Sequence, residues 1–280
     1  MQNNNPQPVK GILWMVLTGI LFVGVTAVVR YTGPVVPAAE AAFLRYSIGL
    51  IFLIPLLRPL LRARPTARQM KIFALRGFFH TIGVALWFYA MVHIPLQDVT
   101  AMGYLSPVYV TIGAAVFLGE KLALRRVVAI GVALIGVAII LRPGLREVGD
   151  GHLAMLVATM AFAGSFLTGK MAADESNPAL VVAMLSLTVS IGLAPLAAMN
   201  WVTPSWTVVG LLTLTALIAT IGHYTMSIAF AAAPLTVTQP VSFLQLIWAV
   251  LLGTTFFDEA FDIWVVVGGV VILGAVVFIT

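Results

Sequence analysis

Two stretches of this 280-residue chain follow one pattern: IPLQDVTAMGYLSPVYVTIGAAVFLGEKL at residues 94–122 and APLTVTQPVSFLQLIWAVLLGTTFFDEAF at residues 233–261. Each runs from a Pro-Leu pair, through a mostly apolar segment with a few polar and aromatic residues, to an acidic residue followed by a short loop. Equivalent positions lie 139 residues apart. This spacing predicts that the chain consists of two related halves.

The composition places the chain in a membrane. Hydrophobic residues make up 61% of it and charged residues 9%, with a mean hydropathy of +1.08, whereas soluble proteins carry about 25% charged residues. Roughly 17–25 apolar residues span a bilayer. Little chain remains outside such stretches, which excludes a soluble catalytic or nucleic-acid-binding domain. The ten predicted spans are 11–29, 38–57, 71–92, 97–118, 124–141, 152–170, 179–198, 207–230, 235–257 and 263–280.

The two halves match beyond their shared apolar composition. Residues 80–141 set against residues 219–280 give fifteen identities in sixty-two pairs, including both Pro-Leu pairs and the acidic residue that ends each stretch. We therefore predict two homologous units, residues 11–142 and 151–280. Each unit holds five spans, an odd number, so the second must enter the membrane from the opposite side. The predicted fold is an all-α polytopic membrane protein with ten transmembrane helices in two inverted five-helix repeats.

The basic residues predict the orientation. With a cytoplasmic N-terminus, three cations fall outside and ten fall inside, as the positive-inside rule requires, and both termini are then cytoplasmic. Residues 1–10 are expected to form a disordered cytoplasmic tail, and the first span is too long for a cleavable signal peptide. The end at Thr280, directly after an apolar run, leaves room for a basic tail beyond it. The inside cations are Lys10, Arg58, Arg62, Arg64, Arg68, Lys71, Lys121, Arg125, Arg126 and Lys170; the outside ones are Arg30, Arg142 and Arg146.

At this level the sequence resembles the drug/metabolite transporter superfamily, and specifically its EamA-type members. The resemblance covers nearly the whole chain and rests on FLRYSIGLIFLIPLL at 43–57, on AMGYLSPVYVTIGAAVFLGEKLALRRVVAIGVALIGVAII at 101–140, and on a second copy at 256–279. The second copy has DE at 258–259 where the first has GE at 119–120. The resemblance implies a central cavity lined by helices 1–4 and 6–9, peripheral helices 5 and 10, and small organic solutes as cargo, often exported amino acids.

Ionisable groups within a span are costly, so each indicates a possible site. Arg45 offers a fork that matches a substrate carboxylate, although snorkelling to the interface is an alternative. His80 and Trp87 share a face of the third span with Arg76. No acidic residue lies in the middle of a span, which leaves His80 and His223 as the candidates for any proton coupling.

Polar and aromatic residues at helical spacing extend this set, and their alternative role is to join helices without a ligand. Pro107 and Pro240 are predicted gating kinks, with static kinks as the alternative. Glu120 and Glu259 precede the helices that begin at 124 and 263, where we expect them to act as structural caps rather than in proton coupling. The predicted substrate-binding residues are Arg45, His80, Trp87, Thr100, Tyr104, Tyr109, His223, Tyr224, Ser227, Gln239, Phe243, Gln245 and Trp248.

Together these features predict a monomeric inner-membrane secondary transporter that moves a small organic metabolite by alternating access. Export of amino acids or related compounds is the first interpretation, and import of a vitamin or nucleoside-like cofactor on the same fold is the alternative. An intramembrane lipid-modifying enzyme is a distant third, because no paired acid and base, phosphate-binding loop or metal-ligand spacing is present. The chain has no cysteine, which excludes thiol catalysis. We expect no cofactor, no metal, no nucleic acid and no enzymatic activity.

Overall fold

The computed structural model describes most of the chain. The described residues are 8–33, 35–54, 65–106, 108–110, 112–113, 124–142, 144–145, 147–176, 178–232, 241 and 244–279. Within them the regular structure is helical, without strands. Their longer helices are α1 (Pro8–Thr32), α2 (Ala38–Ile51), α4 (Ala67–His93), α5 (Leu96–Gly103), α7 (Leu124–Leu141), α8 (Asp150–Glu175), α9 (Pro178–Met199), α10 (Trp206–Ala232), α12 (Leu244–Phe256) and α13 (Ile263–Ile279).

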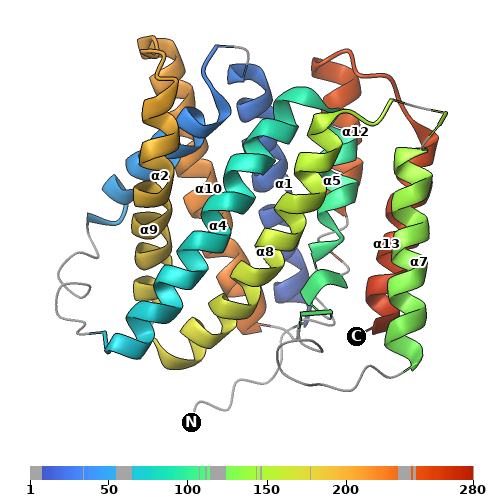
Figure 1. Ribbon diagram of the computed structural model, residues 1–280, viewed down its shortest axis with the longest axis horizontal. Helices are drawn as coiled ribbons and strands as arrows, with labels where there is room; N and C mark the ends of the chain where they lie inside the picture. The colour runs from blue at the N-terminus through green and yellow to red at the C-terminus, as the bar shows by residue number, and fades with distance from the viewer. Residues whose placement is uncertain are drawn as a thin grey trace.

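Successive helices run up and down one bundle, and the start of α1 and the end of α13 lie toward its lower end in Figure 1. Five described helices are long and apolar enough to cross a membrane, in α1, α4, α8, α9 and α10, and three shorter apolar helices lie in α7, α12 and α13. The outer faces carry large exposed apolar side chains, such as Leu13, Ile135, Ile191 and Ile247. Apolar side chains on the outside of a bundle suit a hydrocarbon solvent.

Two predicted spans are shorter as regular helices. The span predicted at 38–57 corresponds to α2, which ends at Ile51. Just beyond it, the Leu53 N–H donates to the Leu50 carbonyl in a tighter turn. Pro55 follows closely, and the residue before a proline avoids the helical region. The span predicted at 97–118 begins with α5, which ends at Gly103, and a further helical stretch lies among the described residues of 106–113. At the other end of the chain, α1 begins at Pro8, earlier than the predicted span.

The helix contacts join the two parts of the chain rather than staying within each. The most extensive helix–helix packing pairs α4 with α8, α1 with α10, α7 with α13 and α2 with α9, while α5 packs on α12. In Figure 1, α4 and α8 cross the bundle together, and α7 and α13 form a pair at its right-hand edge. Every one of these pairs takes one helix from before residue 142 and one from after residue 150. The core is therefore shared between the two parts of the chain.

Glycines allow close contact where helices α7 and α13 cross. A Cβ built on Gly136 would lie 2.8 Å from the Gly268 carbonyl oxygen, and one on Gly268 would lie 2.6 Å from the Gly136 carbonyl oxygen. Both backbones thus need a residue without a side chain, as is common between membrane helices. The neighbouring Gly131 and Gly274 have nothing within 4 Å of an added Cβ, so they do not contribute to this packing.

Candidate functional site

Arg30 and Glu259 join three segments at the upper end of the bundle. Arg30, near the end of α1, donates hydrogen bonds to the backbone carbonyls of Met91, Val92 and Ile94, at 2.8–3.1 Å, where α4 ends. Its guanidinium also lies 3.5 Å from the Glu259 carboxylate. A cation at the end of a helix stabilises the free carbonyls there. The pair therefore ties the junction of α4 and α5 to the loop between α12 and α13.

The Glu259 carboxylate accepts the Leu96 N–H, at 2.9 Å, and so caps the first turn of α5. From the sequence we predict Glu259 as the cap of the helix that begins at 263, but Asp262 caps that helix by accepting the Trp264 N–H at 3.0 Å. The reason is local: Asp258 has a left-handed backbone (φ 51°), which aspartate tolerates. The chain turns back there and directs Glu259 toward α5. Burial raises the pKa of Glu259, with the Leu96 N–H and Arg30 opposing the rise.

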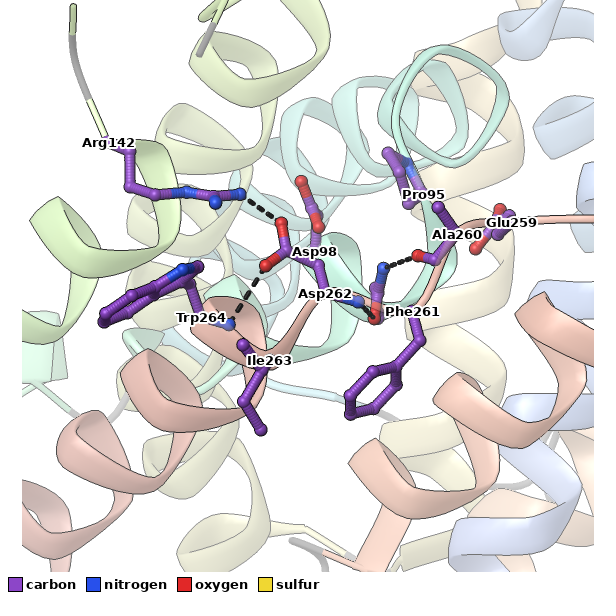
Figure 2. Close-up of a pocket in the computed structure, with 10 residues that line it drawn as sticks. Pro95, Asp98, Arg142, Glu259, Ala260, Phe261, Asp262, Ile263 and Trp264 are labelled. Carbon is purple, nitrogen blue, oxygen red and sulfur yellow. Dashed lines mark hydrogen bonds and ion pairs between the residues drawn. The ribbon is translucent and has the colours of Figure 1, made fainter. Parts of the chain in front are cut away.

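A recess of about 500 Å³ lies beside this loop, between α5, α7 and α13. Figure 2 shows that its polar side chains face one another. Gln97 donates to the Ala260 carbonyl at 2.9 Å, and Arg142 is paired with Asp262. Asp98 is fully buried and lies 3.0 Å from the His152 ring. Because these groups bond to one another at the rim of the bundle, the recess is lined by a polar network that joins α5 and α7 to the segment before α13.

A second polar group lies within the helices, centred on His80 of α4. The His80 Nε2 is 2.8 Å from the Tyr46 hydroxyl of α2, and its Nδ1 is 3.0 Å from the Ser165 hydroxyl of α8. Both ring nitrogens are thus hydrogen-bonded, and the bonds join three helices. His80 has 8% of its surface exposed. A ring held at both nitrogens has a fixed orientation.

Aromatic side chains surround this group. Phe162 of α8 meets the His80 ring edge-on at 5.3 Å between centroids and Trp87 at 6.3 Å. Phe22 of α1 meets His223 of α10 in the same manner at 5.1 Å. Rings in these geometries attract one another and supply rigid apolar surface. The structure therefore brings His80, Trp87 and His223 of the predicted set into one aromatic-walled region, together with Phe22 and Phe162.

Arg45 lies in the same region with 7% of its surface exposed. Its guanidinium is 4.0 Å from the centre of the Tyr46 ring, a cation–π contact. Glu40 on the same helix is not its partner, because that carboxylate accepts the Val202 N–H at 2.9 Å. A cavity of about 30 Å³ lies beside Arg45, between α2, α9 and α10. Its lining residues are Arg45, Tyr46, Gly49, Leu53, Val182, Ser186, Ala216, Thr220 and His223.

Arg76 completes the ionisable groups of this region. Its guanidinium Nη1 lies 3.5 Å from the Val181 carbonyl, and its Nε is buried without a hydrogen-bond partner among the described residues. The charges of Arg45 and Arg76 both act on His80 and on His223. We call Arg45, Arg76, His80 and His223, with Tyr46, the basic cluster.

Other predicted site residues lie away from the basic cluster. Thr100 donates to the Leu96 carbonyl of its own helix, and Tyr104 is hydrogen-bonded to the Leu246 backbone. These hydroxyls form hydrogen bonds within a helix and between helices. This is the role that the sequence allowed as the alternative to solute binding. Tyr224 has 68% of its surface exposed on α10. It follows His223 directly, and one residue turns the side chain by about 100° around a helix, so it faces away from the cavity.

Three further predicted residues are partly buried: Tyr109, Gln245 and Trp248. Gln245 of α12 packs on α1, because its Cγ lies 3.1 Å from where a Cβ on Gly19 would be. The Trp248 indole N–H is buried and has no hydrogen-bond partner among the described residues. Several predicted positions lie outside the described residues: Pro107, Glu120, Gln239, Pro240, Phe243 and the side chain of Ser227.

Sequence reasoning missed Tyr46 and Ser165, the two partners of His80. Tyr46 follows Arg45 directly, and Ser165 is a hydroxyl in an otherwise apolar span three residues after Phe162. Both are polar residues in a mostly apolar span, which is the signal used to predict the other positions. The pairing itself depends on which helices touch, which local sequence does not specify.

Comparison with known proteins identifies the family of this chain. The EamA-like transporter family matches residues 9–142 and, a second time, residues 150–280. The chain belongs to the EamA-like transporter family. A crystal structure of a protein with 18% sequence identity superposes on it with a TM-score of 0.63 and covers 95% of both chains, which shows that the fold is shared.

The relatives of this family member are small-molecule transporters. A riboflavin transporter of Rhizobium johnstonii is 29% identical, over 97% of this chain and 91% of its own. A pseudopaline exporter of Pseudomonas aeruginosa is 25% identical over 95% and 94%, and an S-adenosylmethionine uptake transporter of Rickettsia prowazekii is 26% identical over 96% and 92%. The chain is therefore a polytopic membrane transporter of small molecules and not an enzyme.

Proposed function

We propose that this transporter carries a vitamin-like or cofactor-like solute into the cell and that the basic cluster with its aromatic walls is the solute site. The observation that carries the proposal is the Tyr46–His80–Ser165 chain of hydrogen bonds, which joins helices from both parts of the chain in the membrane interior. Ionisable groups at such a depth mark solute pathways. Relatives that carry riboflavin and S-adenosylmethionine support this cargo class over the amino acids that the sequence first suggested.

The proposal includes two inverted repeats that alternate in access. Two observations support it: the family pattern matches the chain twice, and the contact of α1 with α10 corresponds, after exchange of the two halves, to the contact of α8 with α4. Two copies of one unit facing opposite ways can give two equivalent openings toward one central site. The repeats would be residues 11–142 and 151–280, with one chain as the transport unit.

The orientation is part of the same proposal. The excess of Lys and Arg at the end that holds the chain termini supports a cytoplasmic location of both termini in the inner membrane. The network around Arg30, Glu259 and Arg142 would then close the outer end. The cavity beside Arg45, at about 30 Å³, has room for about one water molecule, so the site must open to admit a solute.

Uptake by the purified protein in proteoliposomes tests the function. Vitamins, nucleosides, S-adenosylmethionine and amino acids are supplied outside, without ATP, and each is measured inside. We expect a vitamin-like or cofactor-like compound to enter down its gradient, and His80→Ala to reduce its entry because the variant removes the centre of the site. Transport of amino acids alone, or of no compound, would contradict the proposal.

A further inference from the structure

Apart from Tyr46, the ionisable groups of the basic cluster are all bases. Two arginines and two histidines come from α2, α4 and α10, and the fixed charge of the arginines acts on both imidazoles. Described carboxylates lie instead in loops or in the first and last turns of helices, as with Glu40 and Asp98. Within the part of the chain that the structure describes, no carboxylate is paired with Arg45 or Arg76.

A buried charge without a counter-ion is unfavourable in a low-dielectric interior. Arg45 is more than nine-tenths buried. It has neither a hydrogen bond nor an ion pair with a described residue, and its guanidinium instead makes a cation–π contact with the Tyr46 ring. Arg76 likewise has a buried Nε without a partner among those residues. The donors of the Arg45 guanidinium and the Nε–H of Arg76 are therefore available to a ligand that brings acceptors and negative charge.

We propose that the solute is an anion, a planar ring compound that bears a carboxylate or phosphate group. This inference rests on the proposed function. The anionic group binds the guanidinium of Arg45, and Arg76 adds a second positive charge. A guanidinium fork matches both oxyanions in a two-bonded geometry. The ring lies against the aromatic walls made by Phe22, Phe162 and Trp87.

The same charges exclude other solutes. A cation would be repelled by two arginines at short range, where the interior dielectric strengthens the repulsion. A neutral ring would leave both guanidinium groups without a counter-charge. The site is therefore specific for charge as well as for shape, and its cargo differs in charge from a sulfonium compound such as S-adenosylmethionine.

The first experiment identifies which compounds of a mixture the protein transports. Proteoliposomes containing the full chain are incubated with a small-molecule extract of bacterial cells, and the enclosed compounds are identified by mass spectrometry. We expect the enriched compounds to be planar and negatively charged at pH 7. Matched pairs of one shape then test charge directly by competition: nicotinate against nicotinamide, and riboflavin 5′-phosphate against riboflavin. In each pair the anion should compete better.

Variants connect the preference to the residues. Arg45→Gln should lower uptake of the enriched anion roughly tenfold or more, as expected for loss of a hydrogen bond to a charged group. Arg45→Lys keeps the charge without the fork and should lower it less. Arg68→Gln is the matched control, since Arg68 is a surface residue whose side chain is 75% exposed. Arg76→Gln is the second variant, for use if Arg45→Gln fails to fold.

The outcomes are distinct. Uptake of a neutral or cationic compound in preference to anions would overturn the inference and leave the transport function standing. Uptake of an anion that is unchanged by both Arg45→Gln and Arg76→Gln would also overturn it. No uptake of any compound by the unmodified protein would overturn the proposed function itself. Repeating the assay in vesicles of phosphatidylcholine alone separates solute binding from binding of an anionic lipid phosphate, which would displace the solute only when anionic lipid is present.

Discussion

His80 shows how one polar residue can join three helices of a membrane protein. A neutral imidazole has one donor and one acceptor nitrogen, and here both are occupied, by Tyr46 at 2.8 Å and Ser165 at 3.0 Å. The ring therefore holds α2 and α8 in register with α4. Because hydroxyl groups can donate or accept, both tautomers fit this chain of bonds, so its direction can reverse without movement of heavy atoms.

Replacing Tyr46 with phenylalanine tests this bond at the residue scale. Tyr46→Phe removes only the hydroxyl and leaves the His80 Nε2 buried without its partner, which should lower stability by about 1 kcal/mol. Thermal unfolding in detergent measures the change. Tyr224→Phe is the control, since its ring lies on the outer surface. Equal melting temperatures for the two variants would show that the Tyr46–His80 bond contributes nothing.

Glu259 predicts a dependence of stability on pH. Its pKa is raised by burial, so the folded protein binds a proton at this carboxyl more readily than the unfolded chain does. The group therefore favours folding below the unfolded pKa, and this contribution is lost as the pH rises through the folded pKa. Glu259→Gln cannot titrate. We expect the melting temperature of the unmodified protein, relative to Glu259→Gln, to increase as the pH is lowered from 7 toward 4.

The control for this prediction is Asp258→Asn. It removes the adjacent carboxylate, which is exposed, and asparagine accepts the same left-handed backbone. If the difference from Glu259→Gln stays constant with pH, or moves the other way, Glu259 is not desolvated as described. The pairing of Glu259 with Arg30 at 3.5 Å opposes the shift, so Arg30→Gln should enlarge the pH effect.

At the scale of elements, the crossing of α7 and α13 depends on two glycines. Gly136→Ala places a methyl group against the Gly268 carbonyl, 2.8 Å from its Cβ, and against Ile272. The backbones cannot move apart without loss of contact, so we expect a destabilisation of about 1–3 kcal/mol. Gly131→Ala on the same helix has open space around it and should be neutral or stabilising. Loss of stability in both variants would contradict the close-contact account.

The positions of several helices could be predicted from sequence because a segment that crosses a bilayer must be long and apolar. The predicted spans 124–141 and 263–280 correspond closely to α7 (Leu124–Leu141) and α13 (Ile263–Ile279). The end of α2 could not be predicted, since apolar residues continue to 57 while the regular helix stops at Ile51. Hydropathy measures transfer into lipid and does not report where a backbone leaves the helical conformation.

The members of the basic cluster could be predicted from sequence only in part. Arg45, His80 and His223 were recognisable because an ionisable side chain in an apolar span is rare. The Glu259 cap could not be assigned to α5, because its direction depends on a single left-handed residue, Asp258. Tyr224 was placed at the site with its neighbour His223, although adjacent helical residues point about 100° apart. Where both faces of a helix are apolar, the sequence does not show which face points toward the interior, because that depends on how the helices pack.

At the scale of the whole molecule, the interior cavity is small and the upper end is held by polar bonds between distant parts of the chain. Gln97 before residue 142 donates to Ala260 after residue 150, and Arg142 pairs with Asp262. Among the described residues, the cavity beside Arg45, at about 30 Å³, is smaller than a vitamin-sized solute. If the two parts move against each other during transport, these bonds must break in every cycle.

Cross-linking this end tests whether opening is required. Gln97→Cys with Ala260→Cys, bridged by a short bifunctional thiol reagent, should abolish uptake of the solute identified in proteoliposomes, and cleavage of a reducible bridge should restore it. The chain has no other cysteine, so only the introduced pair reacts. Tyr89→Cys with His93→Cys is the control, because these stacked side chains belong to one helix and a bridge between them leaves the two parts free. Full uptake with the Gln97–Ala260 bridge intact would mean that the solute passes without separation of α5 from the loop after α12, and alternating access at this end would then be wrong.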